Sequence, residues 1–330
     1  MASTPPRSVA VTGAAGYVGR RLLDRLAREP GVESVVATDI RPLDALPAKV
    51  TFYQQDILDP LDNVLRRHGV QALVHLAFVL RPGRDREAVR RTNVGGARNV
   101  LAACLAAGVP HLTCFSSTTV YGPHPDNPVP LDEGAPPRPP AGFQYAEDKV
   151  ACEALFQAYA QENSGTCVSI LRGCVVMGPG ARNFITRALF KPLLIAVRGH
   201  DPPMQFLHQD DLVDLLMRFL AEEHPGVFNV AGRGEVPYSR MVRLARRPLL
   251  RLPAPLAYGL TELTWRFRLQ SDSPSVGLDF IRYPWVASTE RVQRETGFRF
   301  QYTSEEALRS FLETRPSPPD RGGGHRAAGP

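Results

Sequence analysis

The chain has 330 residues, of which 43% are hydrophobic, enough for a sizeable core and for two subdomains around one cleft. The net charge of +6 is modest and the arginines are spread along the chain, which argues against nucleic-acid binding. The apolar runs fall far short of a membrane span, and residues 1–7 contain no apolar stretch of a signal peptide. Five scattered cysteines without Cys-x-x-Cys pairing indicate reduced thiols and no metal site. We therefore expect a soluble cytoplasmic protein without membrane, nucleic-acid or metal partners.

A glycine-rich turn near the N-terminus is the first element that carries chemistry. A buried strand over residues 8–11 leads into Thr-Gly-Ala-Ala-Gly-Tyr-Val-Gly at 12–19, and a helical pattern follows. Strand, turn and helix in this order form a dinucleotide-binding unit, in which the helix N-terminus faces the phosphates. Gly13 would make the tight turn, Gly16 would let the backbone approach the pyrophosphate, and Gly19 would allow close packing. The cofactor contacts expected here are Gly13, Ala15, Gly16, Tyr17 and Val18.

A second strand over residues 34–38 ends at Asp39, which lies 20 residues after Gly19. An acidic residue at this position suits a free ribose 2′-hydroxyl and therefore favours NAD as the cofactor. Arg41 could instead face a 2′-phosphate, so NADP is the less favoured cofactor. A carboxylate that only starts the turn before Pro42 is the structural alternative.

Strand and helix patterns alternate through the first half of the chain. Buried runs at 51–55, 72–77, 112–116 and 167–171 indicate further strands, and residues 85–107 indicate a long helix that stops at Gly108. This alternation predicts an α/β fold, a Rossmann-type doubly wound parallel sheet with helices on both faces.

The same patterns predict the domain organisation. A flexible N-terminus over residues 1–7 would precede a nucleotide-binding core at 8–181. A smaller C-terminal substrate-binding region would span 182–314, with 206–232 partly re-entering the core. The Pro/Gly/Arg-rich stretch at 315–330 would be a disordered tail.

Two further segments have a distinctive composition. Residues 123–140 contain eight prolines and are expected to form an irregular loop over the cleft, in which His124 is a solvated side chain. Residues 252–269 are amphipathic, and a packed lid or cap helix is favoured over a helix lying on a membrane surface.

Tyr145 and Lys149 form a Tyr-x-x-x-Lys pair in a chain that has only three lysines against 36 arginines. Residues i and i+4 of a helix share a face, so both side chains can reach one pocket. A nearby cation favours phenolate and lowers the pKa of a tyrosine from about 10, towards values useful in acid–base catalysis. A surface helix pair is the alternative for this motif taken alone.

Together these residues resemble the extended short-chain dehydrogenase/reductase family, the group of NAD-dependent epimerases and dehydratases, over roughly residues 8–312. Each further fragment is weak alone, but their order along the chain matches the family. The fragments are Gln55-Asp56-Ile57, His75-Leu76-Ala77-Phe78, Asn93 in Thr92–Gly96, Phe115–Gly122, Leu171-Arg172 with Gly178-Pro179-Gly180, Phe206–Leu212 and Val227–Gly232.

The resemblance implies cofactor contacts beyond the glycine turn. The carboxylate of Asp56 would meet the adenine, and Ile57 would lie beside it. Leu76 and Ala77, at the end of the fourth strand, would lie beside the cofactor.

The resemblance also implies the catalytic residues. Tyr145 would exchange the hydroxyl proton of the substrate, and Lys149 would hold the ribose and lower the tyrosine pKa. Ser117 would hydrogen-bond the substrate oxygen, with Ser116 as the nearby rival. Asn93 would belong to the proton relay of the family.

Two departures from the family pattern bear on the substrate. Relatives that use nucleotide sugars usually carry an asparagine where this chain has Val175, and an arginine where it has Met204 and Gln205. The polar anchors for a nucleotide diphosphate are therefore missing unless other arginines replace them. The substrate contacts expected are Phe78, Thr118, Val175 and Phe206, and the candidate replacement arginines are Arg182, Arg187 and Arg198.

The expected function is hydride transfer at a secondary alcohol or ketone of a sugar-like or alicyclic small molecule. The alternatives are a nucleotide-sugar 4-epimerase, a 3β-hydroxysteroid- or flavonoid-type dehydrogenase, and a non-catalytic NAD-binding regulator. Dehydratase activity is the least favoured, because Thr118-Thr119 stand where such relatives carry Asp-Glu. The resemblance also implies a homodimer formed through helices near 85–107 and 145–163.

Overall fold

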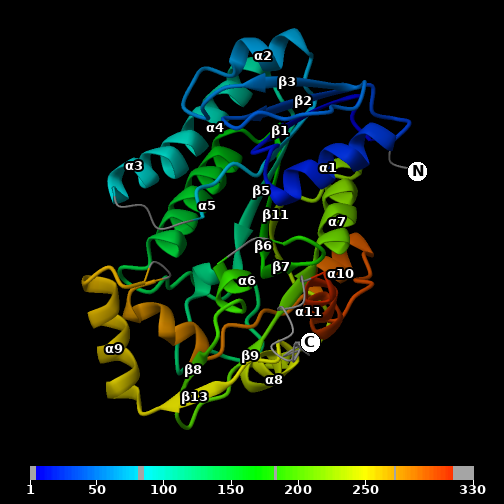
Figure 1. The fold of residues 1–330 in the computed structure, drawn as a ribbon. Coiled ribbons are helices and arrows are strands. Elements are labelled where there is room, and N and C mark those ends of the chain that lie inside the picture. The colour runs from blue at the N-terminus through cyan, green and yellow to red at the C-terminus, as the bar shows by residue number, and fades with distance from the viewer. Residues whose placement is uncertain (1–4, 81–84, 182–183, 271–272, 315–330) are drawn as a thin grey trace, which may run out of the picture.

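The computed structural model describes residues 5–80, 85–181, 184–270 and 273–314 (Figure 1). Its centre is a seven-stranded parallel sheet with the strand order β11-β6-β5-β4-β1-β2-β3. This order confirms the predicted doubly wound Rossmann-type α/β fold. The strands are β1 (Ser8–Thr12), β2 (Ser34–Asp39), β3 (Val50–Gln54), β4 (Ala72–His75), β5 (His111–Ser117), β6 (Cys167–Gly173) and β11 (Gly226–Val230).

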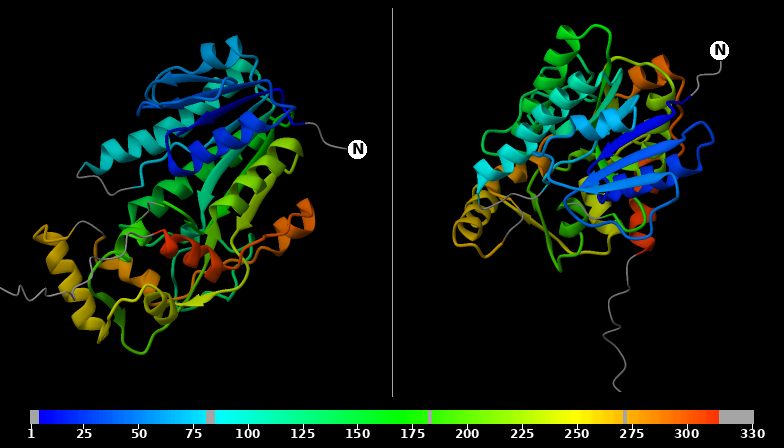
Figure 2. Two further views of the ribbon diagram at one scale, coloured as in Figure 1. Left: turned by 45° about the vertical axis from the view of Figure 1, so that its right-hand side comes forward. Right: turned by 90° about the horizontal axis from the view of Figure 1, so that it is seen from above.

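Helices cover both faces of this sheet, as the near-continuous apolar strands require. In β1, Val9 and Val11 belong to the apolar cluster on one face of the sheet, which α1 (Tyr17–Arg28), α7 (Gln209–Ala221) and α10 (Glu290–Thr296) cover. Ala10 faces the other way and packs with α2 (Asp62–Arg67), α4 (Gly96–Ala107) and α5 (Gln144–Glu162). Figures 1 and 2 show α4 and α5 side by side on one face and α1 with α7 on the other.

The long helix expected at 85–107 forms in three continuous pieces. They are α3 (Arg86–Arg90), a π-helical turn η1 (Arg91–Gly95) and α4. Gly108 ends the helix in the left-handed region, at φ +67°, as its position after the apolar pattern predicted. The π-turn places one extra residue in the helix around Asn93, and such turns are frequent at functional sites.

The smaller region packs below the carboxyl ends of the strands around a separate apolar cluster that includes Met177, Phe206 and Trp285. Three two-stranded sheets support it, pairing β7 with β10, β9 with β12, and β8 with β13. Its strands are β7 (Val175–Met177), β8 (Leu194–Val197), β9 (Pro203–Met204), β10 (Phe206–His208), β12 (Val236–Pro237) and β13 (Leu249–Leu252). Its helices are α6 (Phe184–Ala188), α8 (Tyr238–Leu244), α9 (Ala254–Arg266), η3 (Ser275–Ile281) and α11 (Ser304–Glu313).

The chain returns from this region to the large sheet. After β10, α7 packs beside α1 and β11 pairs with β6, so residues 206–232 belong to both parts. A short helix η2 (Thr118–Tyr121) follows β5, and residues 123–140 contain no helix or strand beyond one bridge between Leu131 and Ala287.

The structure describes part of the N-terminal segment but not the C-terminal tail. Arg7, within the segment expected to be flexible, accepts hydrogen bonds at its carbonyl from the N–H groups of Glu33 and Ser34 (2.7 and 3.0 Å). Residues 1–4 and the tail at 315–330 lie outside the described residues. Within the described part of the chain, no helix has the length and apolar character needed to cross a bilayer.

Candidate active site

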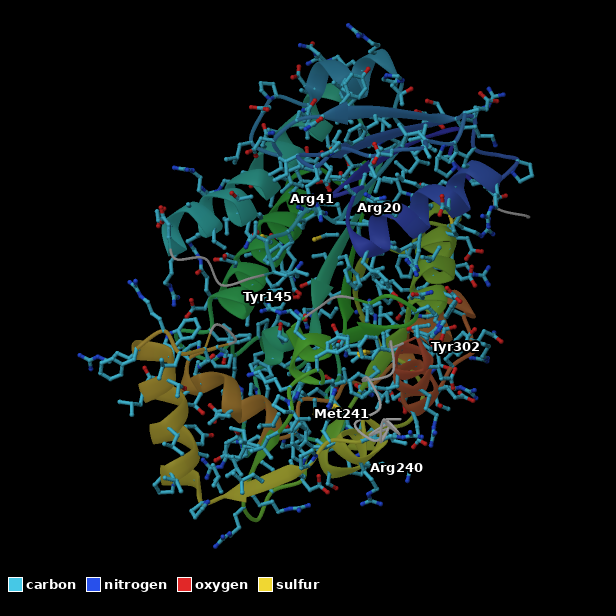
Figure 3. The ribbon with its side chains drawn as sticks, in the orientation of Figure 1. Arg20, Arg41, Tyr145, Arg240, Met241 and Tyr302 are labelled. Atoms are coloured by element: carbon cyan, nitrogen blue, oxygen red, sulfur yellow. The ribbon has the colours of Figure 1, made fainter. Side chains whose placement is uncertain are left out.

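A cleft of about 910 Å³ opens at the carboxyl ends of β1, β2, β4 and β5. Its size lies towards the upper end of the range of roughly 300–1,000 Å³ that small-molecule sites occupy. Figure 3 shows Arg20 and Arg41 at the end beside α1 and β2, and Tyr145 towards the smaller region. The lining includes these predicted site residues: Gly13, Ala15, Gly16, Tyr17, Val18, Asp39, Asp56, Ile57, Leu76, Ala77, Phe78, Ser117, Tyr145, Lys149 and Val175.

The glycine turn has the backbone geometry that a pyrophosphate needs. Gly13 has φ +72°, and a Cβ there would lie 2.5 Å from the backbone nitrogen of Ala77. A Cβ on Gly19 would lie 2.5 Å from the carbonyl oxygen of Gly13, so α1 can approach β1 only because this residue is glycine. The first turn of α1 carries no acidic side chain, which leaves its N–H groups and partial positive charge for an anion.

Asp39 is held at the end of β2 with its carboxylate beside the glycine turn. Its Oδ2 accepts a hydrogen bond from the N–H of Ala15 (2.9 Å), and its Oδ1 accepts from the N–H and Nε of Arg41 (2.9 and 3.3 Å). The Asp39 side chain is 7% exposed, whereas that of Arg41 is 62% exposed. The carboxylate is therefore the fixed group at this end of the cleft and the arginine is the adjustable one.

We expect the native protein to bind NAD more tightly than NADP by on the order of 1–3 kcal/mol. Asp39→Ala is expected to reduce this difference in binding free energy. The carboxylate repels a 2′-phosphate, and its removal frees Arg41 to bind one. Kd values of both dinucleotides, measured by calorimetry, test this. Asp44→Ala, which removes an exposed acid from the following loop, is the matched control and should leave the ratio unchanged. A native preference for NADP would contradict this interpretation of Asp39.

Tyr145 and Lys149 extend from one face of α5 into the cleft, as their spacing predicts. Lys149 is buried, and its Nζ donates to the carbonyl oxygen of Phe115 (2.8 Å) and lies 3.8 Å from the centre of the Phe78 ring. The same Phe78 ring meets Tyr145 edge to face at 5.5 Å. The phenol and the ammonium are thus packed against one aromatic wall of the cleft, and two Lys149 protons remain for a ligand.

The two serines at the end of β5 have different surroundings. Ser116 donates its hydroxyl to Glu153 inside the protein. Ser117 Oγ accepts from the N–H and Oγ1 of Thr119 (3.3 and 3.0 Å), which leaves its own proton available to donate. Of the two candidates, Ser117 therefore has the hydroxyl that can reach a ligand.

Asn93 lies behind the cleft wall rather than on it. Its Oδ1 accepts from the N–H of Val79 (2.8 Å), and its Nδ2 donates to Asp148 (3.1 Å), which is fully buried and also paired with Arg90 (3.0 Å). The π-turn that carries Asn93 is therefore tied both to α5, next to Lys149, and to the segment after β4. Asn93 positions the lining without forming part of it.

Two predicted substrate contacts do not lie in the cleft. Thr118 is fully buried and its Oγ1 has no hydrogen-bond partner among the described residues. Phe206 is also fully buried, in the cluster of the smaller region, because β10 pairs with β7 and turns this ring into the core. We therefore place neither side chain in the substrate site.

A buried polar network that no local pattern predicted lies next to Ser116 and Ser117. Arg172 and Glu153, each 3% exposed, are joined by hydrogen bonds of 2.7 to 3.1 Å. Arg172 also donates to the Tyr121 hydroxyl (2.9 Å), which donates to Asn229 (2.7 Å). The position of Glu153 four residues after Lys149, on the same helix face, was the available signal.

His75 is a second missed residue. One hydrogen bond joins its Nδ1 to Thr12 Oγ1 (2.8 Å), and its ring stacks on Phe156. Burial, together with the nearby Lys149 ammonium, lowers the pKa of His75 to about 3. The imidazole is therefore neutral at physiological pH and contributes no charge to the site. Among the described residues, no group of three or more His, Cys, Asp or Glu side chains is arranged to hold a metal ion.

Comparison with known proteins agrees with this geometry. A model of the NAD dependent epimerase/dehydratase family matches residues 9–231. The chain belongs to this family. An uncharacterized protein of Mycobacterium tuberculosis is 29% identical over 319 residues, covering 94% of this chain and 84% of that protein. The short-chain dehydrogenase/reductase family 42E member 1 of Xenopus laevis is 32% identical over 225 residues, covering 62% of this chain and 56% of that protein. The solved structure of MoeE5 in complex with UDP-glucose and NAD has a TM-score of 0.74 and 26% identity, covering 93% of this chain and 98% of that one.

The substrate end of the cleft differs from the nucleotide-sugar pattern of this family, as the sequence indicates. Met204 is buried in the core of the smaller region, and the Gln205 side chain forms two hydrogen bonds with the backbone of Ala287 (2.8 and 3.0 Å). Neither side chain is free to bind a diphosphate. Of the candidate replacements, Arg187 and Arg198 are exposed and do not line the cleft, and Arg182 lies outside the described residues.

Proposed function

We propose that this member of the epimerase/dehydratase family binds NAD and oxidises a secondary alcohol or reduces a ketone. Epimerisation would consist of two such hydride transfers in opposite directions. The observation that carries the proposal is the convergence of Ser117, Tyr145 and Lys149 on one cleft. A non-catalytic regulator has no need for these three groups together. The wider assignment to NAD-dependent chemistry follows from the family.

The chain's own residues would hold the cofactor along the cleft. The glycine turn and the N-terminus of α1 face the pyrophosphate, and Asp39 accepts the adenine ribose hydroxyls. When bound, the nicotinamide ring supplies the acceptor or donor of the hydride. Asp56 and Ile57, which line the cleft, would meet the adenine, and Leu76 and Ala77 line the cleft beside Gly13.

The protein groups manage the proton and the oxygen. Tyr145 takes the hydroxyl proton in oxidation and returns it in reduction. Ser117 donates its free hydroxyl proton to the substrate oxygen and stabilises the developing negative charge. Lys149 keeps positive charge beside the phenol and binds the ribose through its remaining protons. Asn93 holds the cleft wall in position through its hydrogen bonds with Val79 and Asp148.

For the substrate we propose an uncharged or weakly charged sugar-like or alicyclic molecule. Phe78 and Val175 give its end of the cleft apolar walls. At the positions that relatives use for the diphosphate, Val175 has no polar group, Met204 is buried and Gln205 is bonded to the backbone of Ala287. A buried diphosphate without paired donors carries a large desolvation penalty. A nucleotide-sugar 4-epimerase is the second candidate, because MoeE5 was solved with UDP-glucose and NAD.

Free UDP is expected to bind the NAD-loaded protein with a Kd weaker than about 1 mM, because the positions that relatives use for the diphosphate carry no polar side chain that is free to bind it. Calorimetry with UDP and UDP-glucose measures this directly. A thermal-shift panel of sugar-like, alicyclic and steroid-like alcohols and ketones then identifies the substrate class, because ligands of the native state raise the melting temperature. Micromolar binding of UDP would contradict the proposal and favour the second candidate.

We also propose a cytoplasmic homodimer. The five cysteines are buried free thiols, which suits a reducing compartment. The helices α4 and α5, which lie side by side on one face of the sheet, supply the surface for the dimer (Figure 1). Light scattering measures the mass of the protein in solution and so tests whether it is a dimer.

A further inference from the structure

Helix α9 carries a stripe of apolar side chains that faces away from the protein. Leu256, Leu260, Leu263 and Phe267 are 48, 45, 52 and 65% exposed. At 3.6 residues per turn their positions fall within about 60° around the helix axis, so they form one continuous face. Figures 1 and 2 show α9 at the outer edge of the smaller region in every view.

The opposite face of α9 fixes the helix in this orientation. Ala257 is buried against Val197 and Leu278. The Tyr258 hydroxyl donates to Asp279, and Glu262 accepts from the N–H of Ser275 (3.1 Å). The helix is therefore attached to the protein by its small and polar side, and the leucine stripe remains outside. None of the α9 residues lines the cofactor cleft, so α9 does not form the expected lid over that cleft.

The two ends of α9 carry exposed positive charge. Residues 243–270 contain six arginines and one acid, Glu262, a net charge of +5 within a chain whose total is +6. Arg251 precedes the helix on β13, Arg266 ends it and Arg268 follows it, and all three are exposed. The other three, Arg243, Arg246 and Arg247, lie at the end of α8 and in the turn before β13, so they are not counted with the α9 surface.

We propose that α9 binds in the plane of an anionic lipid bilayer. A helix with a leucine and aromatic face, bordered by arginines, buries its apolar side among the acyl chains while its cations meet the headgroups. Each basic residue held near an anionic membrane surface strengthens binding by a few-fold. Two copies of this chain docked through α9 would bring two positive surfaces together, which disfavours a dimer through this face.

Vesicle flotation of the full chain tests the proposal. We expect binding to vesicles of phosphatidylcholine mixed with phosphatidylglycerol, little binding to phosphatidylcholine alone, and loss of binding when salt is raised to about 0.5 M. Leu260→Gln/Leu263→Gln is expected to weaken binding by about tenfold or more. Arg266→Gln/Arg268→Gln is expected to weaken it by a similar factor, because each cation near an anionic surface contributes a few-fold.

Matched control variants distinguish binding through this surface from nonspecific binding to vesicles. Leu46→Gln/Leu58→Gln removes two exposed leucines from the nucleotide-binding part, and Arg91→Gln/Arg98→Gln removes two exposed arginines there. Both should bind vesicles as the native protein does. Equal binding to neutral and anionic vesicles would overturn the proposal, and so would equal losses of binding in the control variants. It would also be overturned if the α9 variants changed the mass of the protein measured by light scattering but not its binding to vesicles. Should an α9 variant fold poorly, the lipid and salt dependence of the native protein decides the matter.

Discussion

Tyr145→Phe is expected to reduce turnover by about 10²–10⁴-fold, the usual contribution of a positioned general acid or base. The phenol is the proton-exchanging group of the proposed reaction, and phenylalanine keeps the ring contacts with Phe78 while removing the hydroxyl. NAD affinity should stay within a few-fold, because the phenol faces the substrate more than the cofactor. Steady-state kinetics on the identified substrate and NAD calorimetry measure the two effects separately.

Two companion variants make this result specific. Lys149→Ala should lower both turnover and NAD affinity, since Lys149 serves the phenol and the ribose. Tyr302→Phe removes a hydroxyl far from the cleft, on the segment before α11, and should change neither (Figure 3). Turnover by Tyr145→Phe at the native rate would contradict the mechanism while leaving the family assignment untouched.

Glu153→Gln is expected to lower the free energy of unfolding by about 3–5 kcal/mol, because it leaves the Arg172 guanidinium buried without its counter-ion. The variant also weakens the hydrogen bond from Ser116, the neighbour of Ser117. Denaturant unfolding with a two-state analysis measures the loss where the transition is reversible.

The control for this prediction is Glu33→Gln. Glu33 pairs with Arg7 at 2.7 Å, but the two side chains are 58 and 71% exposed. Pairs of this kind contribute about 0–1 kcal/mol, so this substitution should have little effect on stability. A loss in Glu153→Gln as small as that expected of the control would show that the buried ion pair does not stabilise the fold.

Local patterns predicted the parts of the fold that local physics determines. The strand and helix alternation, the glycine turn and the stop at Gly108 all depend on neighbouring residues, and each is found where expected. The Tyr145 and Lys149 side chains reach one cleft because a helix brings residues four apart to one face.

Features that depend on contacts between residues far apart in the sequence could not be predicted. The surroundings of Ser116 depend on Glu153, which lies on another element. The placement of Phe206 in the core depends on β7 and β10 pairing, which no local pattern specifies. The π-turn at Asn93 also escaped prediction, because its sequence reads as an ordinary helix.

The return of the chain to the large sheet has a consequence for dissecting the molecule. The nucleotide-binding part ends along the sequence near residue 181, yet β11 forms the outer strand beside β6 and α7 covers one face of the sheet. A fragment that stops near 181 would leave β6 as a bare hydrogen-bonding edge and uncover the leucines that α7 protects. The two parts therefore do not separate at residue 181, and a fragment that keeps the large sheet complete must extend at least to Val230.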